Sequence, residues 1–303
     1  MKAVHVYAYQ GPAALQVDEV PVPEPGPGEV RIRVMATGLN NSDLQTTYGK
    51  YRVAGQGDCP HGLGQEAAGE IEAVGPGEIS WRPGMRVCGR VRDGLAERAI
   101  ASTAEIIPLP NHFSWTIAAS LPIAYLTASL GLVHKADVKP GEWVLVHPGS
   151  GGVGSASIQL AKSLGARVIA TTSSREKVDY LFHIGANDVL VYDGKAIAPE
   201  IDRTTHGEGV QVAIDGGGKL TLPQCLDCMA NGGRIISYGY TTGLNATIPL
   251  MKLIGRNVSI HGIALWYNTD YGAAWSTLRE VVLPKVINGQ INPVIQPIHG
   301  LEN

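Results

Sequence analysis

The sequence lacks the features that would place a protein on nucleic acid, in a membrane or outside the cell. Its 303 residues carry 24 Lys and Arg against 27 Asp and Glu, a net charge of −3, which leaves no basic excess for nucleic acid or anionic lipid. No run of 18 apolar residues occurs, and the N-terminus has no basic segment followed by an apolar one. Four scattered cysteines are too few for a disulfide framework. We therefore expect a soluble, cytoplasmic protein with a small-molecule ligand.

The first part of the chain, residues 1–122, is rich in glycine and proline and contains short β-like runs. Their close spacing is typical of a small barrel-like β domain. The expected strands are 3–7, 16–20, 29–36, 69–74, 86–90 and 97–101. Because 303 residues usually exceed what one core can hold, we expect a second domain after this one.

From residue 123 the pattern changes to strands that alternate with helices, after a helix expected at 123–135. Such alternation predicts parallel strands joined by right-handed crossovers, hence a doubly wound α/β sheet over 123–264 with its ligand at the carboxyl ends of the strands. The expected strands are 144–147, 167–171, 188–191, 210–214, 234–237 and 258–262, and the expected helices are 152–165, 175–184, 195–205 and 219–230. A further helix is expected at 273–288, within a final segment 265–303.

A glycine-rich turn joins the first strand of this sheet to its first helix. Gly149, Gly151 and Gly154 satisfy G-x-G-x-x-G, in which the glycines provide a tight turn, close approach to a pyrophosphate and close packing of helix on strand. The helix start offers N–H groups and a positive dipole end to the phosphates. The sequence therefore predicts a dinucleotide site here.

The end of the next strand indicates which dinucleotide binds. An NAD site usually has Asp or Glu at this position to bind the ribose 2′-hydroxyl. Here the strand is followed by Ser173, Ser174 and Arg175, with no acid at its tip. Ser173 can donate a hydrogen bond, while Arg175 and Lys177 can meet the charge of a 2′-phosphate. We expect NADP(H); the alternative is that these cations form a solvated helix start.

Seven segments spread over nearly the whole chain carry a resemblance to a known family. They are Glu19-Val-Pro-Val-Pro-Glu-Pro-Gly-Pro-Gly-Glu29, Ala36-Thr-Gly-Leu-Asn-Asn-Ser-Asp43, Gly64-Gln-Glu-Ala-Ala-Gly69, Val74-Gly-Pro-Gly77, Pro83-Gly-Met-Arg-Val87, His147-Pro-Gly-Ser-Gly-Gly-Val-Gly154 and Gly232-Gly-Arg234. In this order they resemble the zinc-independent medium-chain dehydrogenases/reductases, specifically the quinone oxidoreductase (zeta-crystallin-like) family. The resemblance implies a GroES-like catalytic domain (1–122), a Rossmann NADP-binding domain (123–264) and an active site in the cleft between them.

The zinc-dependent members of the superfamily differ from this chain at the metal ligands. Where they have Cys and His, this chain has Asn40 and Gln65, and neutral amides bind zinc poorly compared with thiolate and imidazole. The cysteine cluster that binds structural zinc in those enzymes is also missing. Cys59-Pro-His61 lacks further ligands nearby, and Cys225 and Cys228 fit the packing pattern of a helix. We expect no metal.

The resemblance also implies which residues form the site. Asn40 corresponds to a polar residue beside the nicotinamide, and Tyr51 to a tyrosine at the active-site mouth, although Arg52 replaces the family's proline and Tyr48 lies nearby as a competitor. For Thr127 the alternative is a buried hydroxyl that bonds to the backbone of its own helix. For Tyr51 the alternative is a ring that only packs at the surface. The expected cofactor-binding residues are Thr127, Pro148, Ser150, Gly151, Gly152, Val153, Ser173, Lys177, Tyr192, Tyr238, Gly239 and Thr241.

The function implied by this resemblance is hydride transfer from NADPH to a quinone or enone, an electron-poor conjugated carbonyl, without a metal. One alternative is an enoyl-thioester reductase, for which Lys50 and Arg52 are candidate coenzyme A contacts. Another is a non-catalytic, crystallin-like NADPH-binding protein. A homodimer formed through strand 258–262 is expected. Family members end with a helix and a strand that return to the catalytic domain, and this chain stops at Gly300-Leu-Glu-Asn303, where such a helix would begin. The segment 265–303 is therefore expected to be a truncated return segment to the catalytic domain.

Overall fold

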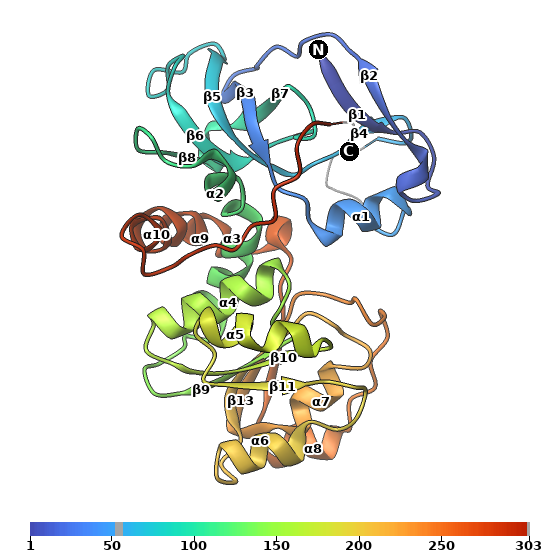
Figure 1. Ribbon diagram of the computed structural model, residues 1–303, viewed down its shortest axis with the longest axis vertical. Coiled ribbons are helices and arrows are strands. Elements are labelled where there is room, and N and C mark those ends of the chain that lie inside the picture. The colour runs from blue at the N-terminus through green and yellow to red at the C-terminus, as the bar shows by residue number, and fades with distance from the viewer. Residues whose placement is uncertain (52–56, 302–303) are drawn as a thin grey trace. The chain divides into compact units, whose positions relative to one another are not determined.

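The computed structural model describes residues 1–51 and 57–301, and within these all but the side chain of Trp266. The chain divides into two compact units (Figure 1). Unit 1 comprises Met1–Ile123 together with Pro293–Asn303, and unit 2 comprises Ala124–Asn292. Of the segment 265–303, expected as a truncated return to the catalytic domain, the residues up to 292 belong to unit 2 and those from 293 on belong to unit 1.

Unit 1 is built on two antiparallel sheets. A five-stranded sheet has the order β7-β3-β5-β6-β8, and a three-stranded sheet has the order β2-β1-β4. The elements are β1 (Lys2–Val6), η1 (Pro12–Ala14), β2 (Leu15–Glu19), β3 (Glu29–Thr37), α1 (Asn41–Thr47), β4 (His61–Gly62), β5 (Glu66–Val74), β6 (Arg86–Arg90), β7 (Arg98–Ser102), η2 (Thr103–Glu105), β8 (Ile106–Pro108) and α2 (Trp115–Ala119). Ile32, Ile71, Val87 and Ile106 form part of its core, since alternate residues of each strand face inward.

Unit 2 contains one parallel sheet of six strands in the order β11-β10-β9-β12-β13-β14. The strands are β9 (Trp143–His147), β10 (Arg167–Thr172), β11 (Asp188–Val191), β12 (Val210–Asp215), β13 (Met229–Ser237) and β14 (Ser259–Gly262). The predicted doubly wound sheet is confirmed. Val144, Leu145 and Val146 of β9 are completely buried, as expected where helices cover both faces of a parallel sheet.

The helices of unit 2 lie on both faces of this sheet. Figure 1 shows α4 and α5 on one face and α6, α7 and α8 on the other. The helical segments are α3 (Pro122–Ser129), η3 (Leu130–Lys135), α4 (Gly152–Ser163), η4 (Arg175–Lys177), α5 (Val178–His183), α6 (Ala198–Thr204), α7 (Leu222–Asp227), α8 (Leu250–Gly255), η5 (Leu265–Tyr267), α9 (Tyr271–Thr277), η6 (Leu278–Val282) and α10 (Leu283–Ile287). Among the described residues, no helix combines the length and apolar character that crossing a membrane requires.

The strand order reverses between β9 and β12. From β9 the chain moves outward through β10 to β11, then crosses back to β12 and continues through β13 to β14. Ligands of such sheets bind beyond the carboxyl ends of the strands at this point. The loops after β9, β10, β12 and β13 are therefore the place to look for a site in unit 2.

Candidate functional site

The turn after β9 is held tightly against the neighbouring strand and helix. Gly149 donates its N–H to the Thr171 carbonyl at 2.7 Å, which fixes the turn on β10. A Cβ atom at Gly154 would lie 2.5 Å from the Pro148 carbonyl oxygen and 2.7 Å from that of Gly149. Helix α4 can therefore pack on the turn only with glycine at 154, the role that the sequence motif assigns to its third glycine.

The other glycines of the turn face open space. A Cβ atom at Gly151 or Gly152 would meet no protein atom within 4 Å, and both residues are exposed. They begin α4, whose first N–H groups have no partner within the helix and carry its positive dipole end. Ser150 and Val153 flank them and are half-buried. The turn thus leaves a cradle that a side chain would fill, next to free N–H donors, which fits a pyrophosphate.

The strand ends beside this turn carry the cationic residues expected for NADP(H). Thr172 at the end of β10 is in register with Val191 of β11, and Tyr192 donates its N–H to the Thr172 carbonyl at 2.7 Å. Ser173 and Lys177 follow β10 and are exposed. Arg175 is exposed as well, and within the part of the chain that the structure describes neither cation forms an ion pair with an acid. The arrangement suits a phosphate on the 2′-oxygen of a ribose.

Two residues that the sequence reasoning missed hold Tyr192 in place. The His147 ring meets the Tyr192 ring edge-on, with 4.9 Å between centroids, and Gln224 Nε2 donates to the Tyr192 hydroxyl at 3.0 Å. Burial lowers the pKa of His147 to about 4, so the ring is neutral at physiological pH. His147 Nδ1 lies 2.5 Å from Thr171 Oγ1. The motif HPGSGGVG predicted the turn but not that its first residue, His147, contacts the ring of Tyr192, which directly follows β11.

A buried aspartate organises the loops after β12 and β13. Asp215 accepts hydrogen bonds from the Gly217 and Gly218 N–H groups and from the Thr221 hydroxyl. Burial raises the pKa of Asp215, while these hydrogen bonds lower it. The backbone N–H of Tyr238 donates to the Asp215 carbonyl at 3.0 Å, which joins the two loops. No sequence pattern predicted a role for this acid, since only its burial distinguishes it.

The loop after β13, predicted to lie at the nicotinamide end, packs on the glycines that follow Asp215. A Cβ at Gly239 would lie 2.5 Å from the Gly216 carbonyl oxygen, and Thr241 Oγ1 donates to that oxygen at 3.2 Å. Tyr238 is half-buried, and burial raises the pKa of its phenol. Unit 2 thus gathers the predicted residues after β9, β10, β11 and β13 at one edge of its sheet. Thr127 is buried within α3.

In unit 1, Asn40 and Gln65 are hydrogen-bond donors to buried acids. Asn40 Nδ2 donates to Glu66 Oε1 at 2.7 Å. Gln65 Nε2 donates to Asp43 Oδ1 at 3.1 Å and to Ser42 Oγ at 2.8 Å. Burial raises the pKa of Glu66 to about 7 and also raises that of Asp43. The positions that resemble zinc ligands in related enzymes therefore carry amides, each of which donates a hydrogen bond to a carboxylate.

The other cysteines and histidines do not add a metal site within the described residues, where no group of three or more His, Cys, Asp and Glu could hold an ion. Cys225 and Cys228 belong to the core of unit 2, as the helix-packing interpretation predicted. All four cysteines are free thiols.

The two tyrosines that follow Asn40 in the chain, Tyr48 and Tyr51, differ in environment. Tyr51 is half-buried. Tyr48 is 45% exposed, and its ring covers Gly11, where a Cβ would lie 2.6 Å from Cε1 of that ring. Lys50 Nζ lies 5.4 Å from the Tyr48 ring centroid. Tyr48 is thus engaged by the N-terminal segment. Arg52 lies outside the described residues.

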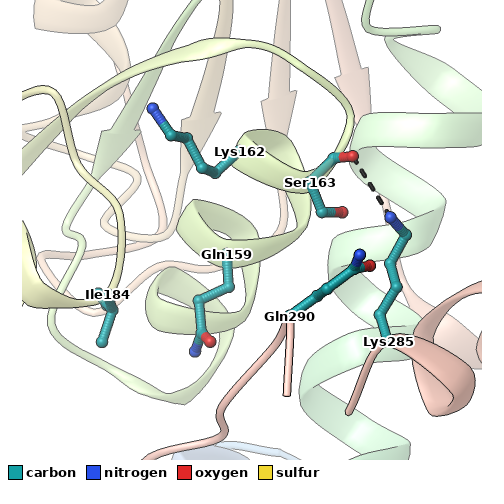
Figure 2. Close-up of a pocket in the computed structure, with 6 residues that line it drawn as sticks. All are labelled: Gln159, Lys162, Ser163, Ile184, Lys285 and Gln290. Carbon is teal, nitrogen blue, oxygen red and sulfur yellow. Dashed lines mark hydrogen bonds between the residues drawn. The ribbon is translucent and has the colours of Figure 1, made fainter. Parts of the chain in front are cut away.

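Each unit also contains a cavity. In unit 1 a cavity of about 470 Å³ has Asp43, Thr46 and Gln65 on its wall. In unit 2 a cavity of about 330 Å³ lies at the end of α4 remote from the glycine turn (Figure 2). Its lining residues are Gln159, Lys162, Ser163, Ile184, Lys285 and Gln290. Figure 2 shows Lys285 directed at the Ser163 carbonyl and Lys162 pointing away, so the two amines do not converge on one point.

The family models that match this chain fall one in each of its two units. Residues 26–111 match the alcohol dehydrogenase GroES-like domain, and residues 152–280 match the zinc-binding dehydrogenase model. The chain is 30% identical to the quinone oxidoreductase of Sus scrofa over 100% of this chain and 91% of that protein. Among solved structures, the quinone oxidoreductase of Pseudomonas syringae is 30% identical with a TM-score of 0.87, covering 96% of this chain and 90% of that one.

Two further structures bear on the ligand. The Escherichia coli quinone oxidoreductase, solved in complex with NADPH, has a TM-score of 0.89 at 26% identity and covers 98% of this chain and 91% of that one. The CurK enoyl reductase has a TM-score of 0.85 at 28% identity and covers 97% and 90% of the two chains.

Proposed function

Since this chain belongs to the quinone oxidoreductase family of the medium-chain dehydrogenases/reductases, we propose that it reduces a quinone or a conjugated enone with NADPH and without a metal. It is an NADPH-dependent oxidoreductase with a GroES-like domain and a Rossmann domain. The observation that carries the proposal is the open cradle at Gly151 and Gly152, with exposed cations at the end of the neighbouring strand.

We assign the parts of the cofactor site by the chemistry of their groups. The N–H groups of Ser150, Gly151, Gly152 and Val153 bind the pyrophosphate, and Pro148, which has no N–H, lines the turn beside it. Ser173 and Lys177 bind the 2′-phosphate, and Tyr192, held by His147 and Gln224, lies beside the adenosine end. Thr127 and the loop residues Tyr238, Gly239 and Thr241 contact the nicotinamide end.

Bound NADPH supplies the hydride, and the protein supplies position and hydrogen-bond donors. Negative charge gathers on the carbonyl oxygen of the acceptor as hydride arrives at its conjugated carbon, so a nearby donor accelerates the reaction. We assign that role to the amide of Asn40, with Tyr51 as a second donor or a ring that stacks on the acceptor. A zinc ion is not part of this proposal, because Asn40 and Gln65 direct amide hydrogens at carboxylates.

A panel of acceptors tests the proposal. NADPH oxidation is followed at 340 nm with 9,10-phenanthrenequinone, 1,4-benzoquinone and crotonyl-CoA in parallel. Turnover of the quinones with little turnover of crotonyl-CoA supports the proposal. Preference for crotonyl-CoA would instead assign the chain to the enoyl-thioester reductases, a candidate that the similarity to CurK favours. Tight NADPH binding without turnover of any acceptor would assign a non-catalytic, crystallin-like role.

We also propose that two copies of unit 2 associate through β14. This strand is the edge of the six-stranded sheet, where unpaired N–H and C=O groups can pair with another strand. Helix α8 precedes it and exposes Leu250, Met251 and Ile254 at 65%, 78% and 64%. Light scattering after size exclusion should give a dimer for the native chain and a monomer for Met251→Glu, with Ile79→Glu, an exposed site in unit 1, as the control; a monomeric native chain would contradict the proposal.

We propose the cytoplasm as the site of action, because all four cysteines are free thiols, as is usual where thiols are kept reduced. In a cell fractionation experiment the protein should separate with cytoplasmic markers.

A further inference from the structure

Glu66 is a buried acid that contacts Asn40 from inside unit 1. Only 3% of Glu66 is exposed, whereas Asn40 is half-buried and can reach a ligand. Glu66 Oε1 accepts a hydrogen bond from Asn40 Nδ2 at 2.7 Å, and Oε2 accepts one from the Ile123 backbone N–H at 2.8 Å. Both oxygens therefore face donors, which is the pattern of an ionised carboxylate.

The backbone between β3 and α1 makes room for this contact. Gly38 lies against the Glu66 side chain so closely that a Cβ atom at position 38 would overlap the carboxylate. The glycine, with its negligible volume, lets the acid reach Asn40 two residues further along. The contact between Glu66 and Asn40 therefore depends on the backbone at Gly38 and not only on the rotamers of the two side chains.

The backbone of Asn40 is fixed separately by a second acid. Asn40 is the N-cap of α1, and its N–H donates to Asp43 Oδ2 at 2.8 Å in a capping box. In the same box the Asn40 side chain accepts a hydrogen bond from the Asp43 N–H, which already favours one of the two orientations that exchange the amide oxygen and nitrogen. Since an ionised carboxylate accepts but cannot donate, Glu66 fixes the nitrogen end of the amide inward from the other side.

We propose that Glu66 is a positioning residue that holds the Asn40 amide with Nδ2 inward, so that this nitrogen keeps at most one hydrogen as a donor for a bound acceptor. The inference rests on the proposed function, in which Asn40 contacts the acceptor. If the amide turned over, Asn40 would present its oxygen in place of this donor, and the negative charge of the reacting carbonyl would lose a stabilising partner.

The electrostatic surroundings connect this role to pH. Burial raises the pKa of Glu66 to about 7, while the hydrogen bonds from Ile123 and Asn40 lower it. The groups that face Glu66 are Asp43 on α1 and the Cys88 thiol on β6, both of which interact with it unfavourably when charged. Arg90, opposite Glu66 in the sheet, is paired with Glu105 at 2.7 Å instead. Protonation of Glu66 near neutral pH would release the amide.

A double-mutant cycle tests the coupling. Glu66→Gln keeps the size of the side chain and an acceptor for Ile123, but turns an N–H₂ group toward Asn40, which must then rotate. We expect kcat with 9,10-phenanthrenequinone to fall about 100-fold, as when one donor to a developing oxyanion is lost. In the Asn40→Ala background the same change should alter kcat less than about twofold, because no amide is left to position. Equal losses in both backgrounds would overturn the inference.

A measurement independent of turnover follows the amide itself. In protein labelled with ¹⁵N-asparagine, the signals that disappear in Asn40→Ala identify the Asn40 side chain. These signals should shift with pH through a transition near the Glu66 pKa of about 7 in the native chain and lose that transition in Glu66→Gln. Signals that are the same in the native chain and in Glu66→Gln would refute the inference even if the enzyme had no activity at all.

Two controls separate positioning from general damage. Glu70→Gln removes an acid of the same strand that pairs with Arg33 at the surface, and it should leave kcat and the Asn40 signals unchanged. Glu66→Asp restores the charge on a shorter side chain and should recover part of kcat relative to Glu66→Gln. If Glu66→Asp recovers nothing while its melting temperature is native, the charge is not what acts, and the inference fails. Absence of turnover in the native chain with intact NMR coupling would contradict the proposed function alone.

Discussion

Two substitutions in the glycine turn separate binding from stability. Ala at 151 places a methyl group where no protein atom lies within 4 Å, whereas Ala at 154 places it 2.5 Å from the Pro148 carbonyl oxygen. Gly151 has φ −89° and ψ 176°, an extended conformation that alanine also adopts. We therefore predict that Gly151→Ala folds normally but loses NADPH affinity, and that Gly154→Ala is destabilised.

The magnitudes follow from these contacts. The methyl group at 151 keeps the pyrophosphate from one or two N–H donors, and hydrogen bonds to a charged group contribute about 1.5 to 3 kcal/mol each. The dissociation constant for NADPH should rise about 10- to 100-fold. The clash at 154 should cost about 1 to 3 kcal/mol, as overpacking does, with a fall in melting temperature of about 2 to 4 °C for each kcal/mol.

Calorimetric titration with NADPH and thermal melts of the ligand-free protein measure both effects. We expect Gly151→Ala to melt within about 2 °C of the native chain, since a single exposed substitution of this kind changes stability little. Binding of NADPH by Gly151→Ala as tightly as by the native protein would refute this reasoning, because the space beside Gly151 would then not be the phosphate site.

Three further predictions concern the cofactor, the metal and pH. Lys177→Asp should raise the KM for NADPH about tenfold or more and leave the KM for NADH nearly unchanged, since only NADPH carries the 2′-phosphate. Equal effects on the two KM values would contradict the assignment of Lys177 to the 2′-phosphate. The purified protein should contain no stoichiometric zinc by elemental analysis and should keep its quinone turnover after dialysis against a chelator; one zinc per chain would contradict this. The raised pKa of Glu66 means that the folded chain binds a proton that the unfolded chain has lost, so the stabilising contribution of this group is present below about pH 4.5 and is lost as pH rises to about 7. The melting temperature of Glu66→Gln should accordingly gain on that of the native chain between pH 5 and pH 8; a constant difference would show that Glu66 is not the titrating group.

The sheet of unit 2 could be predicted from the sequence because its strands are buried on both faces. Such strands appear in the sequence as short, mainly apolar runs, for example 144–147, separated by amphipathic helices. All six strands were predicted to within a few residues. The exception in length is β13, which begins at Met229 rather than near 234, because the polar stretch around Asn231 is exposed and carries no apolar signal.

Several elements of unit 1 were not predicted. Helices α1 and α2 are short, and β4 and β8 have only two and three residues, too few for a periodic pattern to appear. These elements form because the rest of the unit holds them: α1, for example, is capped by Asn40 and Asp43.

The residues of the candidate site could likewise be predicted only in part. Its glycines and cations could be predicted, because they lie close together in the chain and their spacing is typical of a dinucleotide-binding turn and the strand end beside it. His147 and Gln224 could not, because both contact Tyr192, which is distant from them in the chain. Asp215 could not either, because only its burial distinguishes it from other acids. Glu66 stood within a recognisable motif, but its contact with Asn40, 26 positions away, depends on the pairing of β3 with β5.

The central claim is that this chain transfers hydride from NADPH, and a comparison of the two nicotinamide cofactors tests it most directly. The native protein, dialysed against a chelator, is supplied with 9,10-phenanthrenequinone and either NADPH or NADH, and oxidation is followed at 340 nm. We predict turnover with NADPH at a kcat/KM about tenfold or more above that with NADH, the ratio expected from the charged contacts to the 2′-phosphate. No oxidation of either cofactor, or equal rates with both, would contradict the account.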